Sequence, residues 1–61
     1  MKRGEFIKHL EKNHCILLRE GANHSIYLNT KNKKQATVGR HRELSDLLCK
    51  IICNQLDIPK I

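Results

Sequence analysis

Arg19-Glu20-Gly21-Ala22-Asn23-His24-Ser25-Ile26-Tyr27 contains the first tight turn of the chain. A run of apolar residues ends just before this segment, and its glycine and asparagine both tolerate the positive φ that tight turns often require. After the turn, side chains with a hydroxyl group alternate with aliphatic ones, which is typical of a half-buried strand. The segment therefore predicts two antiparallel strands joined by a turn, with Ser25 and Tyr27 on one face and Ile26 and Leu28 on the other.

The sequence predicts a helix and a strand before this turn. Residues 4–12 form a short helix in this interpretation, because their large apolar side chains have one-face spacing: Phe6, Ile7 and Leu10. Asn13 is expected to end the helix in the left-handed conformation. Residues 15–19 are too apolar for a loop and too few for a helix, so they predict the first strand.

The chain after the second strand has the pattern of a hairpin tip followed by a third strand. Residues 29–34 carry turn residues and lysines but no large apolar group, which predicts the tip. Residues 36–38 then predict a short third strand, so that the three strands form an antiparallel meander.

A second helix is predicted from the serine at position 45 onward. Ser45 followed by Asp46 is typical of a helix N-terminus, because the serine caps free amides and the helix dipole favours a carboxylate there. Pro59 is expected to end the helical region, with Ile58 folding back over it. The face expected to pack on the sheet carries Leu44, Leu48, Ile52 and Leu56, with Cys49 and Cys53 beside them.

The order helix, three strands, helix predicts an α+β domain of two layers spanning residues 1–61. Both helices are expected on one face of a three-stranded antiparallel sheet, which leaves the other face open. The double-stranded-RNA-binding fold has this α-β-β-β-α architecture and grips RNA by its backbone shape. Since a chain of this length buries only about 60% of its unfolded surface, an open surface site is expected rather than a deep pocket.

The charge of the chain favours a polyanionic partner. Twelve lysines and arginines against six acidic residues give a formal charge of +6. Such a charge suits nucleic acid or an acidic protein surface, although a solvated basic surface alone would look the same. No apolar run approaches the ~18 residues of a membrane span, so no membrane association is expected. The three cysteines lie in apolar runs, as buried thiols do in a reducing cytosol, which favours a cytoplasmic protein.

A metal site is the main alternative use of these cysteines. Cys49 and Cys53 are four residues apart on the predicted second helix, and His14 and Cys15 are adjacent near the first strand. Three or four potential zinc ligands therefore exist. Their spacing lacks the paired short loops of structural zinc sites, and the core needs both helical cysteines. We therefore expect no metal and no cofactor.

Several segments together resemble one family. They are GEFIKHLEKN at 4–13, ILLRE at 16–20, GANHSIY at 21–27, the pair Arg40-His41, and KIICNQLDI at 50–58. The chain resembles the HicA family of small toxins over nearly its whole length. These toxins are messenger-RNA interferases of toxin–antitoxin systems. Ala22 stands where the family commonly has serine, and Gly39 stands where a proline is usual.

The resemblance implies the fold described above and a catalytic histidine just after the glycine turn, which is His24. Metal-independent RNA cleavage uses the ribose 2′-hydroxyl as nucleophile and needs a general base and a general acid. Histidine suits either role because it titrates close to physiological pH. The alternative interpretation of His24 is a strand-edge histidine that is hydrogen-bonded to a loop carbonyl.

Two basic clusters are the candidates for RNA contact. Lys31, Lys33 and Lys34 on the predicted tip would steer the RNA backbone. A second cluster would contact the phosphate or supply the complementary proton transfer, and its members are Arg40, His41 and Arg42.

The resemblance also implies a protein partner, a HicB-type antitoxin. Such a partner would be acidic and would cover His24. Leu47 and Ile51 form a second apolar row on the last helix, which is either covered by the sheet or first helix or available to this partner.

Three functions remain open on the sequence. The first is a messenger-RNA-cleaving toxin, the second a non-catalytic module that binds double-stranded RNA, and the third a protein whose basic face meets only an acidic partner. Loss of cleavage in His24→Ala would select the first, and the absence of any salt-dependent RNA affinity would select the third.

Overall fold

Five elements follow one another in the computed structural model, which describes all residues, 1–61. They are α1 (Arg3–Lys12), β1 (Cys15–Glu20), β2 (His24–Asn29), β3 (Gln35–Gly39) and α2 (Asp46–Leu56). The predicted α-β-β-β-α order is confirmed, and the predicted element boundaries differ from these by one or two residues. Neither helix has the length and apolar character needed to span a membrane.

The first helix ends at Lys12 as predicted, but the left-handed residue after it comes one position later than expected. Asn13 has φ −107°, and its amide group instead donates a hydrogen bond to the His9 carbonyl over 2.8 Å. The left-handed residue is His14, with φ 68°. The prediction for Asn13 was therefore wrong, because this side chain and the Asn13 N–H, which bonds to the Leu10 carbonyl, still satisfy the last turn of the helix.

The three strands form one antiparallel sheet in the order β1-β2-β3. Tyr27 of β2 is buried while Ile26 is only half-buried, and the same alternation continues to Leu28 and Asn29. The predicted faces of β2 are therefore confirmed. Leu17 lies opposite Tyr27, and a β-bulge follows between Leu17 and Arg19.

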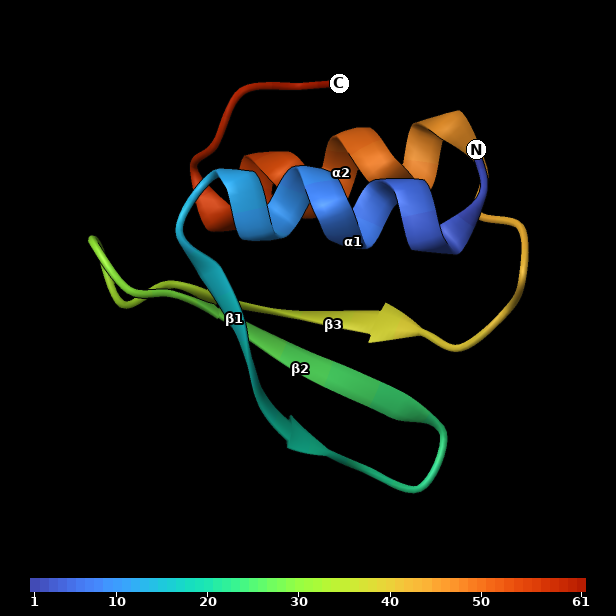
Figure 1. Ribbon diagram of the computed structural model, residues 1–61, viewed down its shortest axis with the longest axis horizontal. Helices are drawn as coiled ribbons and strands as arrows, with labels where there is room; N and C mark the ends of the chain where they lie inside the picture. The colour runs from blue at the N-terminus through green and yellow to red at the C-terminus, as the bar shows by residue number, and fades with distance from the viewer.

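Both helices lie on the same face of the sheet, and the opposite face is uncovered (Figure 1). The β1–β2 and β3–α2 connections and the start of α1 all lie at one end of the sheet, whereas the β2–β3 tip lies at the other. One core fills the space between helices and sheet. Its largest fully buried side chains are Phe6 and Leu10 of α1, Val38 of β3, and Ile52 and Leu56 of α2. Each contributes about 1.5–3 kcal/mol on burial.

The second helix begins and ends as the sequence predicts. The Ser45 hydroxyl accepts a hydrogen bond from the Leu48 N–H over 3.1 Å, so this serine is the N-cap. Asp57 is left-handed at the other end, and the Ile58 N–H donates to the Cys53 carbonyl over 3.0 Å. Ile58 also packs against the core.

The buried strip of α2 is narrower than expected. It consists of Cys49, Ile52, Cys53 and Leu56, preceded by the buried Leu44. Leu48 is 39% exposed, so its predicted place in the core was wrong. At about 100° per residue, Leu48 points about 90° away from the centre of this strip. A single helix resting on an edge strand cannot cover so wide an arc.

The second apolar row lies on the outer side of α2. Leu47 is 69% exposed and Ile51 is 45% exposed. The possibility that the sheet or the first helix covers them was therefore wrong, because both helices lie side by side on one sheet face. Their use by a protein partner stays a prediction.

Candidate active site

His24 is the first residue of β2 and its side chain is exposed. Strand alternation puts it on the open face of the sheet, with Ile26 and Leu28. The turn before it is closed by a hydrogen bond of 2.7 Å, which the Gly21 N–H donates to the His24 carbonyl. His24 therefore stands at the end of the sheet without a covering layer.

Gly21 is needed at this turn for a different reason from the one expected. Neither Gly21 nor Asn23 has positive φ, so the prediction of a left-handed turn residue was wrong here. A Cβ at position 21 would lie 3.3 Å from the His24 carbonyl oxygen, which is unusually close. Glycine thus allows the chain to approach itself where β2 begins.

His41 lies close to Gly39, the residue that pairs with His24. Gly39 is paired directly with His24 in the β2–β3 ladder, and residues paired in this way project to the same face. A Cβ at Gly39 would lie 3.5 Å from Cδ2 of His41. The His41 ring therefore lies on the open-face side of Gly39, and the two imidazoles flank a position that has no side chain.

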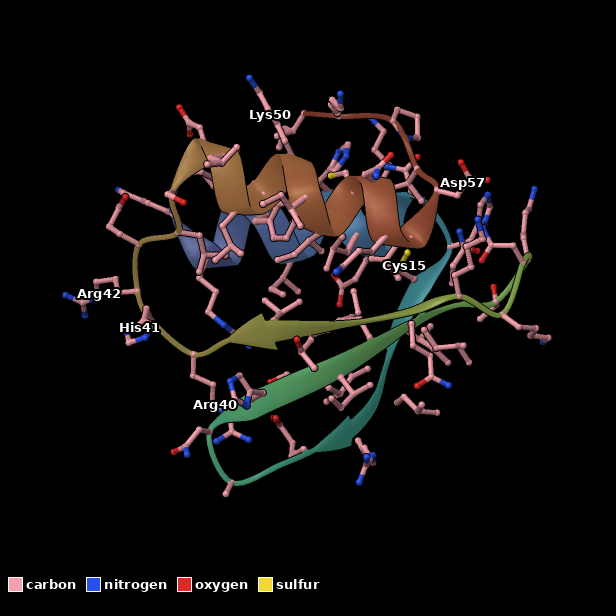
Figure 2. All side chains as sticks on the ribbon, turned by 180° about the vertical axis from the view of Figure 1, so that it is seen from behind. Cys15, Arg40, His41, Arg42, Lys50 and Asp57 are labelled. Carbon is pink, nitrogen blue, oxygen red and sulfur yellow. The ribbon has the colours of Figure 1, made fainter.

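A hollow of about 360 Å³ opens beside His41, next to the turn that precedes His24. Its lining residues come from the β1–β2 turn and from the segment after β3: Ala22, Asn23, Arg40 and His41. In Figure 2 the Arg40 side chain lies over the β1–β2 turn, whereas His41 and Arg42 project from the β3–α2 connection. Two separate connections therefore build the site.

Arg40 holds the turn that precedes His24. Its Nη1 donates to the Ala22 carbonyl over 3.0 Å, and its Nη2 donates to the carbonyls of Gly21 and of His24, the latter over 3.1 Å. Nη2 also lies 2.9 Å from Oε1 of Glu20. Most N–H groups of this guanidinium are thus used within the protein, close to His24 but directed at its backbone.

A chain of polar contacts connects this arginine to α1. The Ser25 hydroxyl donates to Oε1 of Glu20 over 2.6 Å and accepts from Nη2 of Arg3 over 3.1 Å. Nε of Arg3 donates to the Gly39 carbonyl over 2.8 Å. The hydrogen bond from Ser25, followed by that from Arg40, lowers the pKa of the Glu20 carboxyl. We name Arg3, Glu20, Ser25 and Arg40 the polar network.

Three members of this network, Arg3, Glu20 and Ser25, were not predicted as site residues. Arg3 and Gly39 are 36 positions apart, so no local pattern could have associated them. Ser25 was predicted to share a strand face with Tyr27, and only the structure shows that this face is buried.

The tip lysines lie far from His24. Lys31, Lys33 and Lys34 follow the last residue of β2, at the opposite end of the sheet (Figure 1). Five residue steps of about 3.3 Å separate the two ends of β2, or about 17 Å. Lys34 lies 3.9 Å from a carboxylate oxygen of Asp57. The structure therefore brings His24, Arg40 and His41 together and leaves the three lysines apart.

The cysteines belong to the core. Cys15, Cys49 and Cys53 are free and buried, and burial raises the pKa of each thiol. No three His, Cys, Asp or Glu side chains meet in a group that could hold a metal ion.

Comparisons with known proteins used the whole chain, which includes this site. Protein-family models, curated proteins and solved structures give no significant match.

Proposed function

We propose that the protein is a metal-independent endoribonuclease that cleaves messenger RNA, as the resemblance to HicA-type toxins implies. His24 is the catalytic histidine that the resemblance implies, and His41 supplies the complementary proton transfer. The observation that carries it is the position of two imidazoles, His24 and His41, on either side of Gly39 at the open end of the sheet. An RNA strand can reach both rings there without entering a pocket.

Two histidines supply what this reaction requires. One imidazole takes the proton from the ribose 2′-hydroxyl, whose oxygen attacks the adjacent phosphorus. The other imidazole gives a proton to the 5′-oxygen as the P–O bond to it breaks, which leaves a 2′,3′-cyclic phosphate and a free 5′-hydroxyl. Each positioned acid or base contributes about 10²- to 10⁴-fold.

Charge on the phosphorane oxygens needs cationic donors nearby. Arg42 is exposed and follows His41 directly. Arg40 also lines the hollow, but its guanidinium mainly holds the backbone of the turn before His24. Positioned donors of this kind stabilise the negative charge that develops in the transition state.

The proposal includes an acidic protein partner, a HicB-type antitoxin, and a cytoplasmic location. A basic surface with an exposed catalytic histidine can be inhibited by a protein that covers it. Leu47 and Ile51 are exposed on α2 and are available to such a partner. Free buried cysteines suit a reducing compartment.

The test compares wild type, His24→Ala and His41→Ala on a long transcript in the presence of a chelator. We expect each substitution to lower the cleavage rate by about 10²-fold or more, while RNA affinity changes only a few fold. His14→Asn is the matched control, because His14 is exposed at the far end of β1 and asparagine tolerates its left-handed backbone.

The alternative function is a non-catalytic module that binds double-stranded RNA. It would be selected if the wild-type protein bound the transcript and left it intact. Induced expression of wild type and His24→Ala in cells, with growth and transcript integrity measured together, extends the same comparison to the proposed toxin activity.

A further inference from the structure

A second hollow, of about 690 Å³, lies at the N-terminal half of α1. Its lining contains four cationic side chains and two acidic ones, namely Lys2, Arg3, Lys8, Arg42, Glu5 and Glu43. We name it the α1 groove. Positive side chains therefore outnumber negative ones by two to one, which favours an anionic ligand.

The α1 groove lies at the same end of the sheet as the His24 site, and consecutive residues line the two hollows. Arg42 lines the groove, while His41, the residue before it, lines the hollow next to the turn that precedes His24. Arg3 forms part of the groove wall, and its Nε donates to the carbonyl of Gly39, the residue paired with His24. An RNA strand that passes from the histidines around this end of the sheet would therefore meet the groove.

The two walls of the groove are held together by backbone contacts. The Arg3 N–H donates to the Arg42 carbonyl over 2.9 Å, and Lys2 pairs with Glu43 in an isolated β-bridge. The groove is therefore formed in the free protein and needs no rearrangement to accept a ligand.

Its cations are also free to bind. Lys2, Lys8 and Arg42 are exposed and take part in none of the ion pairs of the protein. Arg3 is different, because it already donates to Gly39 and Ser25 and so serves as part of the wall.

We propose that the α1 groove binds the phosphate backbone of RNA, with Lys2, Lys8 and Arg42 as the phosphate contacts. The position of the groove at the same end of the sheet as His24 makes it the continuation of the path along which the substrate lies, and in that respect it rests on the proposed function. Phosphate contacts of this kind supply affinity and register and carry no base specificity.

The test measures the salt dependence of RNA affinity in the His24→Ala background, which prevents cleavage. The probe is a labelled single-stranded RNA of mixed sequence. The variant is Lys2→Gln with Lys8→Gln, and the charge-matched control is Lys31→Gln with Lys33→Gln at the β2–β3 tip. Both pairs remove two exposed lysines, so they change the net charge equally.

Loss of two phosphate contacts lowers the slope of log affinity against log salt by about 1.4 for a single strand. Between about 50 and 200 mM salt the groove variant should therefore lose about sevenfold less affinity than the parent. The tip lysines were candidates for steering RNA, but they lie at the end of β2 opposite His24, so the tip variant should keep a slope nearer that of the parent. An unchanged slope in the groove variant, an equal or larger change in the tip variant, or RNA affinity without salt dependence would each overturn the proposal.

Cleavage assays separate this proposal from the nuclease proposal. A dinucleotide fills only the His24 site, so its kcat/KM should be the same in wild type and in the groove variant. A longer RNA should show a raised KM in the groove variant with kcat unchanged. If no RNA is cleaved while the predicted slopes are observed, the nuclease fails and the groove stands. If long RNA is cleaved equally well by wild type and by the groove variant, the groove proposal is wrong and the nuclease proposal stands.

Discussion

At the scale of single residues, Arg40 makes contacts within the protein, whereas its sequence position favours a phosphate contact. Its guanidinium holds the carbonyls of the turn before His24 and the Glu20 carboxylate. A planar fork can do this with several N–H groups at once, whereas an ammonium group cannot. Arg40 is therefore best described as a positioning residue for His24.

Arg40→Lys distinguishes the two roles. A phosphate contact would survive the change because the charge remains, but the fixed fork would be lost. We expect cleavage to fall in Arg40→Lys nearly as far as in Arg40→Gln, with hydrogen exchange of the Gly21 amide accelerated in both. The cost in stability should stay below about 2 kcal/mol, because the ion pair is largely exposed. Cleavage at the wild-type rate in Arg40→Lys would restore the phosphate role.

Glu20 makes the polar network sensitive to acid. The Ser25 hydroxyl and then the Arg40 guanidinium lower the pKa of its carboxyl below the usual 4.5. A lowered pKa in the folded state adds stability above the unfolded value, and this contribution is lost as pH falls through the folded value. Between about pH 5 and pH 3, Tm should therefore fall more in wild type than in Glu20→Gln. Parallel curves would mean that the carboxylate contributes nothing to folding.

At the scale of elements, α2 has a buried strip and an exposed apolar row. Ile52 is fully buried, whereas Leu47 is mostly exposed. The helix covers β3 along one line only, so the width of its apolar surface exceeds the width of the contact. The row that remains is available to a partner and contributes little to folding.

Two substitutions on α2 compare the contribution of the buried strip to stability with that of the exposed row. Ile52→Ala should cost about 2–5 kcal/mol because it leaves a cavity in the core. Leu47→Asp should change stability by no more than about 0.5 kcal/mol, since the side chain touches little. Thermal unfolding followed by circular dichroism checks both. Loss of helical signal in Leu47→Asp would mean that the residue is covered in solution, and its proposed use by a partner would then fail.

At the scale of the whole molecule, the Asn29 side chain connects the helical layer to the sheet by a hydrogen bond. It is 4% exposed at the end of β2, and its side-chain amide donates to the Leu56 carbonyl at the end of α2 over 2.9 Å. Its side-chain oxygen accepts from the Lys31 N–H over 2.9 Å. One side chain thus joins β2, the tip and the C-terminal end of α2.

Asn29→Ala should be among the most damaging polar substitutions. Removal of a buried hydrogen-bonding group costs about 1–3 kcal/mol, and each kcal/mol lowers Tm by about 4–8 °C in a domain of this size. Asn32→Ala is the comparison, because Asn32 also donates to the Leu56 carbonyl, over 3.0 Å, but is exposed. An equal decrease in Tm in the two variants would contradict a special role for the buried amide.

The sequence by itself determined the elements, their order and the faces of β2. Helix periodicity, strand alternation and the Ser45 cap depend on neighbours a few residues away, so local physics suffices for them. It also indicated His24 and His41 as candidates, although not that they flank Gly39.

The tertiary structure alone decided which residues surround His24. The register of β2 on β3 pairs His24 with Gly39, and a slip of one residue would have turned His24 to the other face. Arg3 meets Ser25 and Gly39 only because α1 packs where it does. Likewise, the exposure of Leu48 depends on how much of α2 the sheet can cover. Contacts between distant residues follow from packing, and no local pattern in the chain encodes them.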